Sequence, residues 1–244
     1  VAYDRTNSHD DSWSASGIGN ISIDRYFLDI TDAIEVPFGA LKLQSDEFLE
    51  EAYADIGTID EVGFDYQQVF LGYYGGVIDP VNTDNDTNNE NIDYVSILDG
   101  APFNQTYSLV STGYNGKIAI NMSTQYDKNL YLGLNLNSHF IDYQRSSLFL
   151  ENNDVEFGNT LSTTGNGFSF QIGGILKLTN EFRLGLTYDS PTWYTIQEET
   201  VQSITSVEAD DDIDFISNII NIYPEYKIQT PAQVRGSLAY VFGK

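Results

Sequence analysis

Alternation of apolar and polar residues dominates the second half of the chain. The segment Lys117–Tyr126 alternates, Asp127–Asn129 interrupts the pattern, and the alternation resumes at residue 130. A period of two places successive side chains on opposite faces of a β-strand, so the two segments predict strands joined by a tight turn. In the second strand, one parity holds Leu130, Leu132, Leu134 and Leu136, and the other holds Tyr131, Gly133, Asn135, Asn137 and His139.

The same pattern recurs on both sides of a second short turn, Thr179–Glu181, and again near the end of the chain. Strands of ten or more residues exceed the ~5–6 residues usual in globular proteins. They fit the ~9–11 residues that cross a bilayer at a tilt. The apolar parity of these further strands holds Phe168, Phe170, Ile172, Leu176, Leu178, Phe182, Leu184, Leu186, Tyr188, Val234, Leu238, Tyr240 and Phe242.

The polar parity decides between a membrane barrel and a soluble β-sandwich. It carries mainly Gly, Ser, Asn, Gln and Thr, with the scattered charged or titratable side chains of His139, Lys177, Arg183 and Arg235. A water-facing sheet normally carries many more charges, whereas small neutral polar groups suit a crowded lumen and Leu, Ile and Phe suit lipid. The pattern favours an all-β fold, an antiparallel transmembrane β-barrel, with the sandwich as the alternative.

The connections divide the chain further. We expect one barrel domain over 1–244, with barrel strands over 105–243 and long polar loops at 149–166 and 196–222. Short turns on one rim and long loops on the other are typical of outer-membrane barrels, whose long loops lie outside the cell. The chain has no apolar run of the ~20 residues that a membrane-spanning helix needs.

The period changes between residues 45 and 76, which predicts a helical insertion into an extracellular loop. Ser45 is the predicted cap of a first helix that ends at Gly57, and a second helix is predicted over 60–74. One interpretation is a helical hairpin that packs its apolar face on the barrel rim. The other is a hydrophobic groove that binds a ligand, lined by Phe48, Leu49, Tyr53, Phe70 and Tyr73.

Composition narrows the chemistry. The net charge of -25 argues against nucleic-acid binding, and the presence of only 2 His argues against a multi-histidine metal centre. The absence of Cys excludes disulfides. An acidic, Asn-rich loop spans 82–100, where Asp84, Asp86 and Glu90 are candidate Ca²⁺ ligands. A solvated loop without metal is the alternative. Such acidic patches also suit bridging to lipopolysaccharide through divalent ions.

No catalytic motif is present. The chain contains neither a Gly-x-Ser-x-Gly elbow nor a His-Glu-x-x-His sequence, so we predict that it is not an enzyme and needs no cofactor. A lipid-acting barrel enzyme that uses His139 remains an alternative class.

Three segments together resemble FadL-type outer-membrane transporters of long-chain fatty acids and other hydrophobic compounds. They are Gly165–Gly174 (G-x-G-x-x-F-x-x-G), Arg183–Pro191 (R-x-G-x-x-Y-x-S-P) and Thr230–Tyr240, with Thr-Pro at its start. The helical insertion before residue 76 is similar to that of the branch of this family found in Bacteroidetes.

The resemblance implies a monomeric, fourteen-stranded barrel in the bacterial outer membrane. An N-terminal hatch would plug its lumen, a lateral opening would pass ligands into the bilayer, and extracellular loop helices would capture a fatty acid or hydrocarbon. The luminal cations would meet a carboxylate head group or pair with inward carboxylates such as Asp189. Because the hatch and about half the strands lack counterparts here, we expect an incomplete portion of a longer chain. An adaptor in a protein-secretion or surface-assembly complex, bound to protein partners, is the alternative function.

Overall fold

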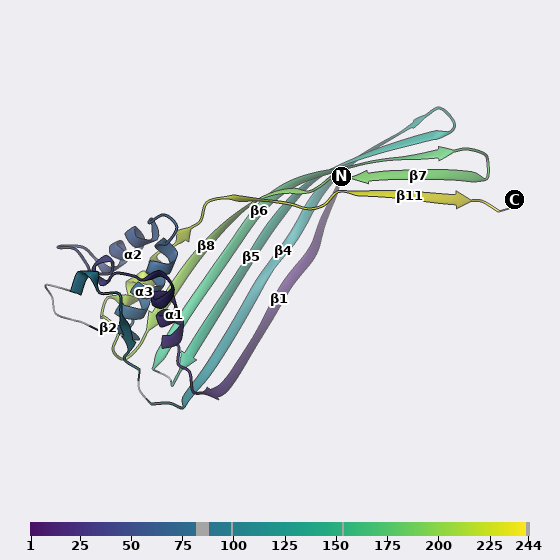
Figure 1. Ribbon diagram of the computed structural model, residues 1–244. Coiled ribbons are helices and arrows are strands. Elements are labelled where there is room, and N and C mark those ends of the chain that lie inside the picture. The colour runs from purple at the N-terminus through teal and green to yellow at the C-terminus, as the bar shows by residue number, and fades with distance from the viewer. Residues whose placement is uncertain (82–87, 99, 153, 243–244) are drawn as a thin grey trace.

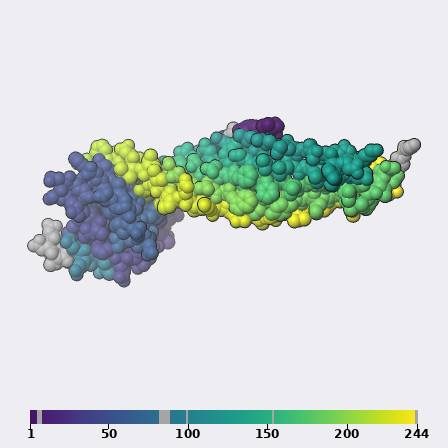
Figure 2. Space-filling model, turned by 90° about the horizontal axis from the view of Figure 1, so that it is seen from above, coloured from purple at the N-terminus to yellow at the C-terminus, as the bar shows by residue number. Residues whose placement is uncertain are grey.

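The computed structural model describes residues 1–81, 88–98, 100–152 and 154–242 and shows a mostly β protein with one large antiparallel sheet. Long strands run side by side, and helices gather at one end of them (Figure 1). Seen from above, the molecule is elongated, with the helical part at one end (Figure 2). The predicted predominance of antiparallel β-structure is confirmed.

The nine-stranded sheet has the order β1-β4-β5-β6-β7-β11, with β8 paired to β6, β9 and β10. A small separate sheet pairs β2 with β3. The strands are β1 (Ala2–Gly19), β2 (Ile78–Pro80), β3 (Tyr94–Ser96), β4 (Phe103–Tyr126), β5 (Leu130–Glu151), β6 (Val155–Lys177), β7 (Phe182–Asp189), β8 (Trp193–Thr205), β9 (Asn221–Ile222), β10 (Tyr226–Gln229) and β11 (Gln233–Tyr240). The helices are α1 (Asp24–Ile34), α2 (Leu49–Gly57), α3 (Gly63–Tyr74) and the 3-10 turns η1 (Phe38–Ala40), η2 (Asn88–Glu90) and η3 (Ile213–Asn218).

The two predicted tight turns are confirmed. β4 and β5 pair from Tyr126↔Leu130 onward around residues 127–129, and β6 and β7 pair from Lys177↔Arg183 onward around residues 178–181. Asp127 at the first turn has a φ of 54°, the left-handed conformation that Asp tolerates better than most residues. Both turns lie at the same end of the sheet, which we call the turn end.

The predicted long loop at 149–166 is wrong, and the one at 196–222 is wrong for its first part, while residues 206–220 do connect strands. β5 continues to Glu151 and β6 begins at Val155, so only a short connection separates them. The first part of 196–222 belongs to β8, which pairs with β6 from Phe168↔Trp193 to Glu156↔Thr205. Most residues of these stretches are polar, and the few apolar residues, such as Val155, Phe157 and Leu161, recur too irregularly to predict strands. Their backbones nevertheless pair.

The alternation of apolar and polar residues did not predict β1 either, because Ala2–Gly19 consists largely of Ser, Asp, Asn and Gly. It pairs with β4 along its length, with a register shift between residues 5 and 7. His9, which lies in this strand, contacts Ser111 Oγ at 2.7 Å. Long-range pairing, and not local alternation, makes this segment a strand.

β7 and β8 form one line along β6, and β11 and β10 form a second line beside it. Each line is interrupted by a proline, Pro191 or Pro231, which has no N–H to donate to a ladder. Side chains replace the missing pairing: Phe170 N donates to Ser190 Oγ at 2.8 Å, and Thr192 N to Thr230 Oγ1 at 2.9 Å. The sheet bends near these interruptions (Figure 1).

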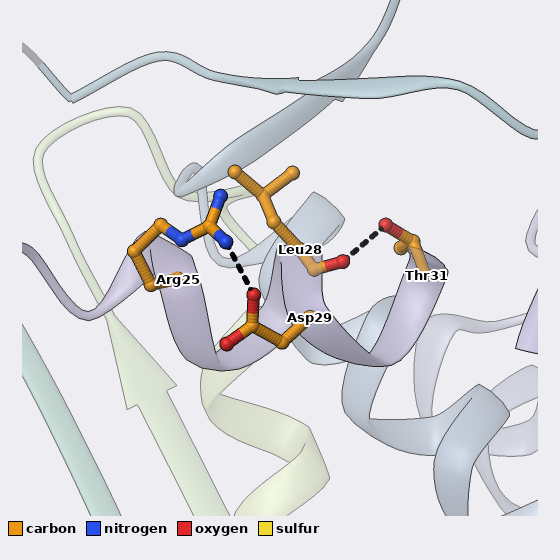
Figure 3. Close-up of polar contacts among 4 residues, drawn as sticks. All are labelled: Arg25, Leu28, Asp29 and Thr31. Atoms are coloured by element: carbon orange, nitrogen blue, oxygen red, sulfur yellow. Dashed lines mark hydrogen bonds and ion pairs between the residues drawn. The ribbon is translucent and has the colours of Figure 1, made fainter. Parts of the chain in front are cut away.

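The helices form a compact unit, here called the helical cap (residues 20–81 and 88–98). Its core contains buried side chains from all three α-helices and continues onto β6 and β8 through Val155, Phe157 and Ile204. In α1, Phe27 is fully buried, while the exposed side carries an Arg25–Asp29 ion pair of 2.6 Å and Thr31 donates to Leu28 O at 2.8 Å (Figure 3). An exposed i,i+4 pair contributes only about 0.3–0.5 kcal/mol, so burial holds this helix in place.

The two helices predicted within residues 45–76 are confirmed, with shifted starts. α2 begins at Leu49 after Phe48, so Ser45 is not its cap, and it ends at Gly57 as expected. α3 begins at Gly63 and ends before Gly75-Gly76, where Gly76 has a φ of 65°. α1 comes from a segment for which the pattern predicted no helix. Within the described residues, no helix is long and apolar enough to cross a membrane.

Alkaline pH is expected to loosen the cap. Burial raises the pKa of Tyr74 to about 12 and also raises the pKa of Tyr53 and Tyr94, so their folded-state pKa values exceed the ordinary value near 10. The stabilisation is complete below about pH 10 and is lost as the pH rises above it. Protease resistance of the cap should therefore fall between about pH 10 and pH 12. Unchanged resistance at the upper pH would contradict this prediction.

Candidate functional site

One face of the sheet is apolar near the turn end, and we call it the apolar face. The register aligns Met122, Leu134 and Ile172 across β4, β5 and β6, and it aligns Leu176, Leu184 and Leu238 across β6, β7 and β11. Several of these side chains are largely exposed, including Leu238 at 71%. The face also includes Ile118, Ile120, Leu132, Leu136, Leu186 and Val234.

Aromatic side chains border the apolar face at both ends. Tyr126, Phe182 and Tyr240 lie at the turn end, and Phe140, Phe168, Phe170, Tyr188 and Trp193 lie toward the cap. Phe170 stacks on Trp193 at 6.4 Å. From Leu130 to Phe140 a strand advances about 33 Å. With a tilt of ~40° that advance corresponds to an apolar band ~25 Å tall, the height found on outer-membrane barrels.

The opposite face is polar, and we call it the polar face. Asn137 Nδ2 donates to Ser169 Oγ at 3.1 Å, and Asn135 Nδ2 donates to Gln171 Oε1 at 3.0 Å. His139 Nε2 lies 2.8 Å from the same Ser169 hydroxyl. Neutral cross-strand hydrogen bonds of this kind make the face rigid without placing many charges on it.

The four predicted luminal residues all lie on the polar face, since His139, Lys177, Arg183 and Arg235 share its parity in the register. Their partners differ. Arg235 forms an ion pair with Asp189 at 2.8 Å, as the packing alternative expected. Lys177 Nζ donates to Tyr131 Oη at 2.7 Å, and Arg183 Nε is buried without a hydrogen-bond partner in the described part of the chain.

The Gly165–Gly167 motif has a steric explanation. A Cβ at Gly165 would lie 2.6 Å from Ile196 Cδ1, and one at Gly167 would lie 2.7 Å from Tyr194 Cδ1. Both side chains of β8 therefore lie directly over the backbone of β6. The Tyr194 ring also packs edge-on against the His139 ring, with ring centroids 5.7 Å apart. The two rings therefore cover part of the polar face beside Gly167.

The cap docks on the polar-face side of the sheet, at the end opposite the turns. Its contact includes a buried hydrogen-bond network around Gln202 of β8. Tyr53 Oη donates to Gln202 Oε1 at 3.0 Å, and Gln68 Nε2 donates to the same oxygen at 2.7 Å. Gln202 Nε2 returns a bond to Gln68 Oε1 at 3.0 Å, so the two amides satisfy each other.

The residues predicted to line a groove take different positions. Leu49, Tyr53 and Phe70 are buried in the cap core, Tyr73 is half-buried against Phe38, and Phe48 is 64% exposed. In this structure the first three pack inside the cap and leave no surface open to a ligand. Ligand binding by this set stays a prediction.

A different apolar pocket lies on the cap, between the α2–α3 connection and residues 219–224. It has a volume of about 270 Å³ and is lined mainly by Phe64, Ile219, Ile220, Ile222, Tyr223 and Pro224. Ile220 and Ile222 are more than half exposed. The sequence signal was the apolar run Ile-Ile-Asn-Ile-Tyr-Pro inside an otherwise polar segment.

Of the three predicted calcium ligands, the described residues include Glu90. Asp84 and Asp86 lie outside the described residues, and Glu90 is exposed in η2. Among the residues that the structure does describe, no group of three His, Cys, Asp or Glu side chains is placed to hold a metal ion. A calcium site at 82–90 stays a prediction.

Comparisons with protein-family models, with curated proteins and with solved structures gave no match. A functional assignment therefore rests on the residues and the geometry of this chain.

Proposed function

We propose that this chain supplies strands to a transmembrane β-barrel of a bacterial outer membrane, which takes up long-chain fatty acids or other hydrophobic compounds without an energy source. The supporting observation is the pair of opposite faces near the turn end. One is apolar, exposed and bordered by aromatic rings, and the other is polar and largely neutral. The apolar face would contact lipid and the polar face would line a lumen, and this arrangement accounts for both faces.

The proposed orientation places the turn end in the periplasm and the helical cap outside the cell. On the outer part of the sheet, the parity that continues the apolar face becomes polar, with Asp142 and Gln144 in β5 and Ser162 and Thr164 in β6. Such residues suit strands that extend beyond the bilayer into water. The cap then lies where a ligand from outside arrives first.

The pocket at residues 219–224 is the proposed capture site. At about 270 Å³ it is close to the lower end of small-molecule sites, which start near ~300 Å³. Each buried CH₂ group of a hydrocarbon stabilises binding by about 0.8 kcal/mol. Capture and release need no covalent step, which agrees with the prediction that the chain is not an enzyme.

Uptake of labelled palmitate by cells that carry the full-length protein tests this proposal. Ile222→Asp places a charge in the pocket and should lower uptake about tenfold, because a bound hydrocarbon would remove water from the unpaired carboxylate. Val207→Asp, at a residue that is 76% exposed and outside the pocket, should leave uptake unchanged. Equal uptake in both variants would remove the pocket from the proposal. No uptake by the wild type, with stoichiometric protein partners, would favour the adaptor function.

A further inference from the structure

A hollow lies on the same side of the sheet as the apolar face, just beyond the aromatic border toward the cap. Two rows of side chains across β1, β4 and β5 line it, namely Ser8, Tyr114 and Asp142 in one row and Asp10, Thr112 and Gln144 in the next. These residues continue the parity of Ile118 and Ile120, so they point away from the proposed lumen. The volume is about 330 Å³, inside the range of small-molecule sites, which begins near ~300 Å³. We call this hollow the Tyr114 site.

The level of the Tyr114 site follows from Phe140, which belongs to the aromatic border of the apolar face. Phe140 packs edge-on against Tyr114, with ring centroids 6.0 Å apart, and stacks on Tyr3 at 5.9 Å. Asp142 and Gln144 follow Phe140 on the same face of β5, about 7 and 14 Å further along the strand. At a tilt of ~40° they lie about 5 and 10 Å above the border. Because the head-group region adds about 5–8 Å to each side of the hydrocarbon core, the site faces the head groups of the outer leaflet.

Charge and geometry argue against an ion as the ligand of the Tyr114 site. Two carboxylates, Asp10 and Asp142, belong to the lining, and the described lining contains no lysine or arginine. His9 also lies there, but its ring contacts the hydroxyl of Ser111 at 2.7 Å. A phosphate would therefore be repelled. No three acidic or histidine side chains of the described chain are grouped to hold a metal ion, which argues against a cation.

The lining instead presents acceptors for hydroxyl groups. In the described part of the chain, the exposed side chains of Asp10, Asp142 and Gln144 form no hydrogen bond or ion pair with another residue. A carboxylate that accepts from a hydroxyl forms a charge-assisted bond, roughly twice as strong as a neutral one. Gln144 adds an amide that both donates and accepts. Tyr114 adds a half-buried aromatic ring, whose negative face attracts C–H groups. A sugar ring, with hydroxyls at its edge and C–H groups on its faces, matches this combination.

We propose that the Tyr114 site binds an uncharged sugar residue of the lipopolysaccharide that surrounds the barrel in the outer leaflet. Asp10, Asp142 and Gln144 bond its hydroxyl groups, and Tyr114 packs against its C–H face. The inference goes beyond uptake, and it rests on the membrane placement in the proposed function. The bound glycolipid is a fixed neighbour of the barrel wall and not a transported compound, since the site lies on the face opposite the proposed lumen.

Binding of three probes to the full-length protein, in a detergent that has no sugar head group, tests the proposal. The probes are rough-type lipopolysaccharide, the same lipopolysaccharide after removal of its phosphates, and its water-soluble core oligosaccharide after removal of the lipid. Native mass spectrometry counts the bound molecules, and titration gives the dissociation constants. We expect both lipid forms to bind with similar affinity, with or without EDTA. The free oligosaccharide should bind at least about tenfold more weakly, because it has no acyl chains to contact the apolar face.

One variant of the hollow and one matched control separate the sugar contact from general charge. Asp142→Ala should weaken binding of both lipid forms about tenfold, through loss of a charge-assisted bond. If lipopolysaccharide contacted this face through its phosphates, the loss of a negative charge would strengthen binding instead. Glu156→Ala removes an exposed carboxylate of β6 on the same side of the sheet and outside the hollow. This control should bind all three probes as the wild type does.

Four results would overturn the sugar site. Equal or tighter binding by Asp142→Ala would show that the carboxylate does not contact a sugar, and an equal loss in Glu156→Ala would show an effect of overall charge. Release of lipopolysaccharide by EDTA would indicate a bridging divalent cation. Equal affinities for the free oligosaccharide and for lipopolysaccharide would indicate a soluble saccharide as the ligand.

The sugar site and the proposed function fail in different ways. If cells take up palmitate but the protein binds no lipopolysaccharide, the sugar site is wrong and the uptake function stands. If the protein binds lipopolysaccharide as expected but cells take up no palmitate, the sugar site stands and the uptake function is wrong.

Discussion

Replacing Met122 with Arg is expected to prevent stable insertion of the full-length protein into a bilayer. Met122 lies on the apolar face of β4 and is 51% exposed, next to Leu134 of β5. In water an Arg at such an exposed position would be tolerated. Against lipid, an arginine near the middle of the bilayer costs about 2–4 kcal/mol. The measurement is the urea dependence of unfolding in lipid vesicles, with recovery from the outer-membrane fraction as a second readout.

Ser123→Arg is the matched control, because it changes the next residue of the same strand, which is exposed on the opposite face. A lumen accepts an arginine, so this variant should insert with nearly wild-type stability. If the two variants behave alike, the apolar face does not contact lipid. The membrane assignment would then be lost, and an ordinary soluble sheet would be the better description.

Replacing Glu151 with Ala is expected to release the helical cap from the sheet. Glu151 is 1% exposed at the end of β5, and its carboxylate accepts bonds from Ser22 Oγ, from Ile23 N at 3.1 Å and from Gln105 Nε2 at 2.7 Å. Truncation leaves these donors without their acceptor inside the protein, which costs about 3 kcal/mol. Because Ser22 and Ile23 immediately precede α1, the helix loses its attachment to β5.

Limited trypsin digestion measures this release, since the cap contains cleavage sites at Arg25 and Lys42. Cleavage at both should become several-fold faster in Glu151→Ala, while the long strands stay resistant. Glu156→Ala changes an exposed carboxylate on β6, five residues further along the chain, and should have no effect. Equal cleavage rates in the two variants would show that Glu151 does not hold the cap.

The strands of the turn end follow from the sequence because their information is local. In Leu130–Leu136 and Phe182–Tyr188 every second residue is apolar, and a polar tight turn precedes each run. A strand with such alternation is stable only when its apolar face contacts an apolar environment. The pattern therefore predicts both the strand and the environment of each of its faces. Gly75-Gly76 similarly sets the end of α3, where a positive φ is required.

The outer parts of β5, β6 and β8 could not be predicted this way. Polar residues dominate these segments, apart from the apolar side chains that meet the cap, and the same Ser, Thr and Asn residues are common in loops. β1 was missed for the same reason. Their strand state comes from pairing with partners that are distant in sequence, such as Ala2 with Ala119, and local composition does not encode that pairing.

The sequence by itself determined the antiparallel sheet near the turn end, its two tight turns, its apolar and polar parities and the helical character of residues 49–74. Only the tertiary structure decided which side chains meet. It paired Arg235 with Asp189 but left Lys177 facing Arg183, and it buried Tyr53 and Phe70 in the cap while Ile222 stayed exposed beside a pocket. The physical reason is range: alternation depends on neighbours along one strand, whereas ion pairs, burial and pockets depend on how separate segments align in space.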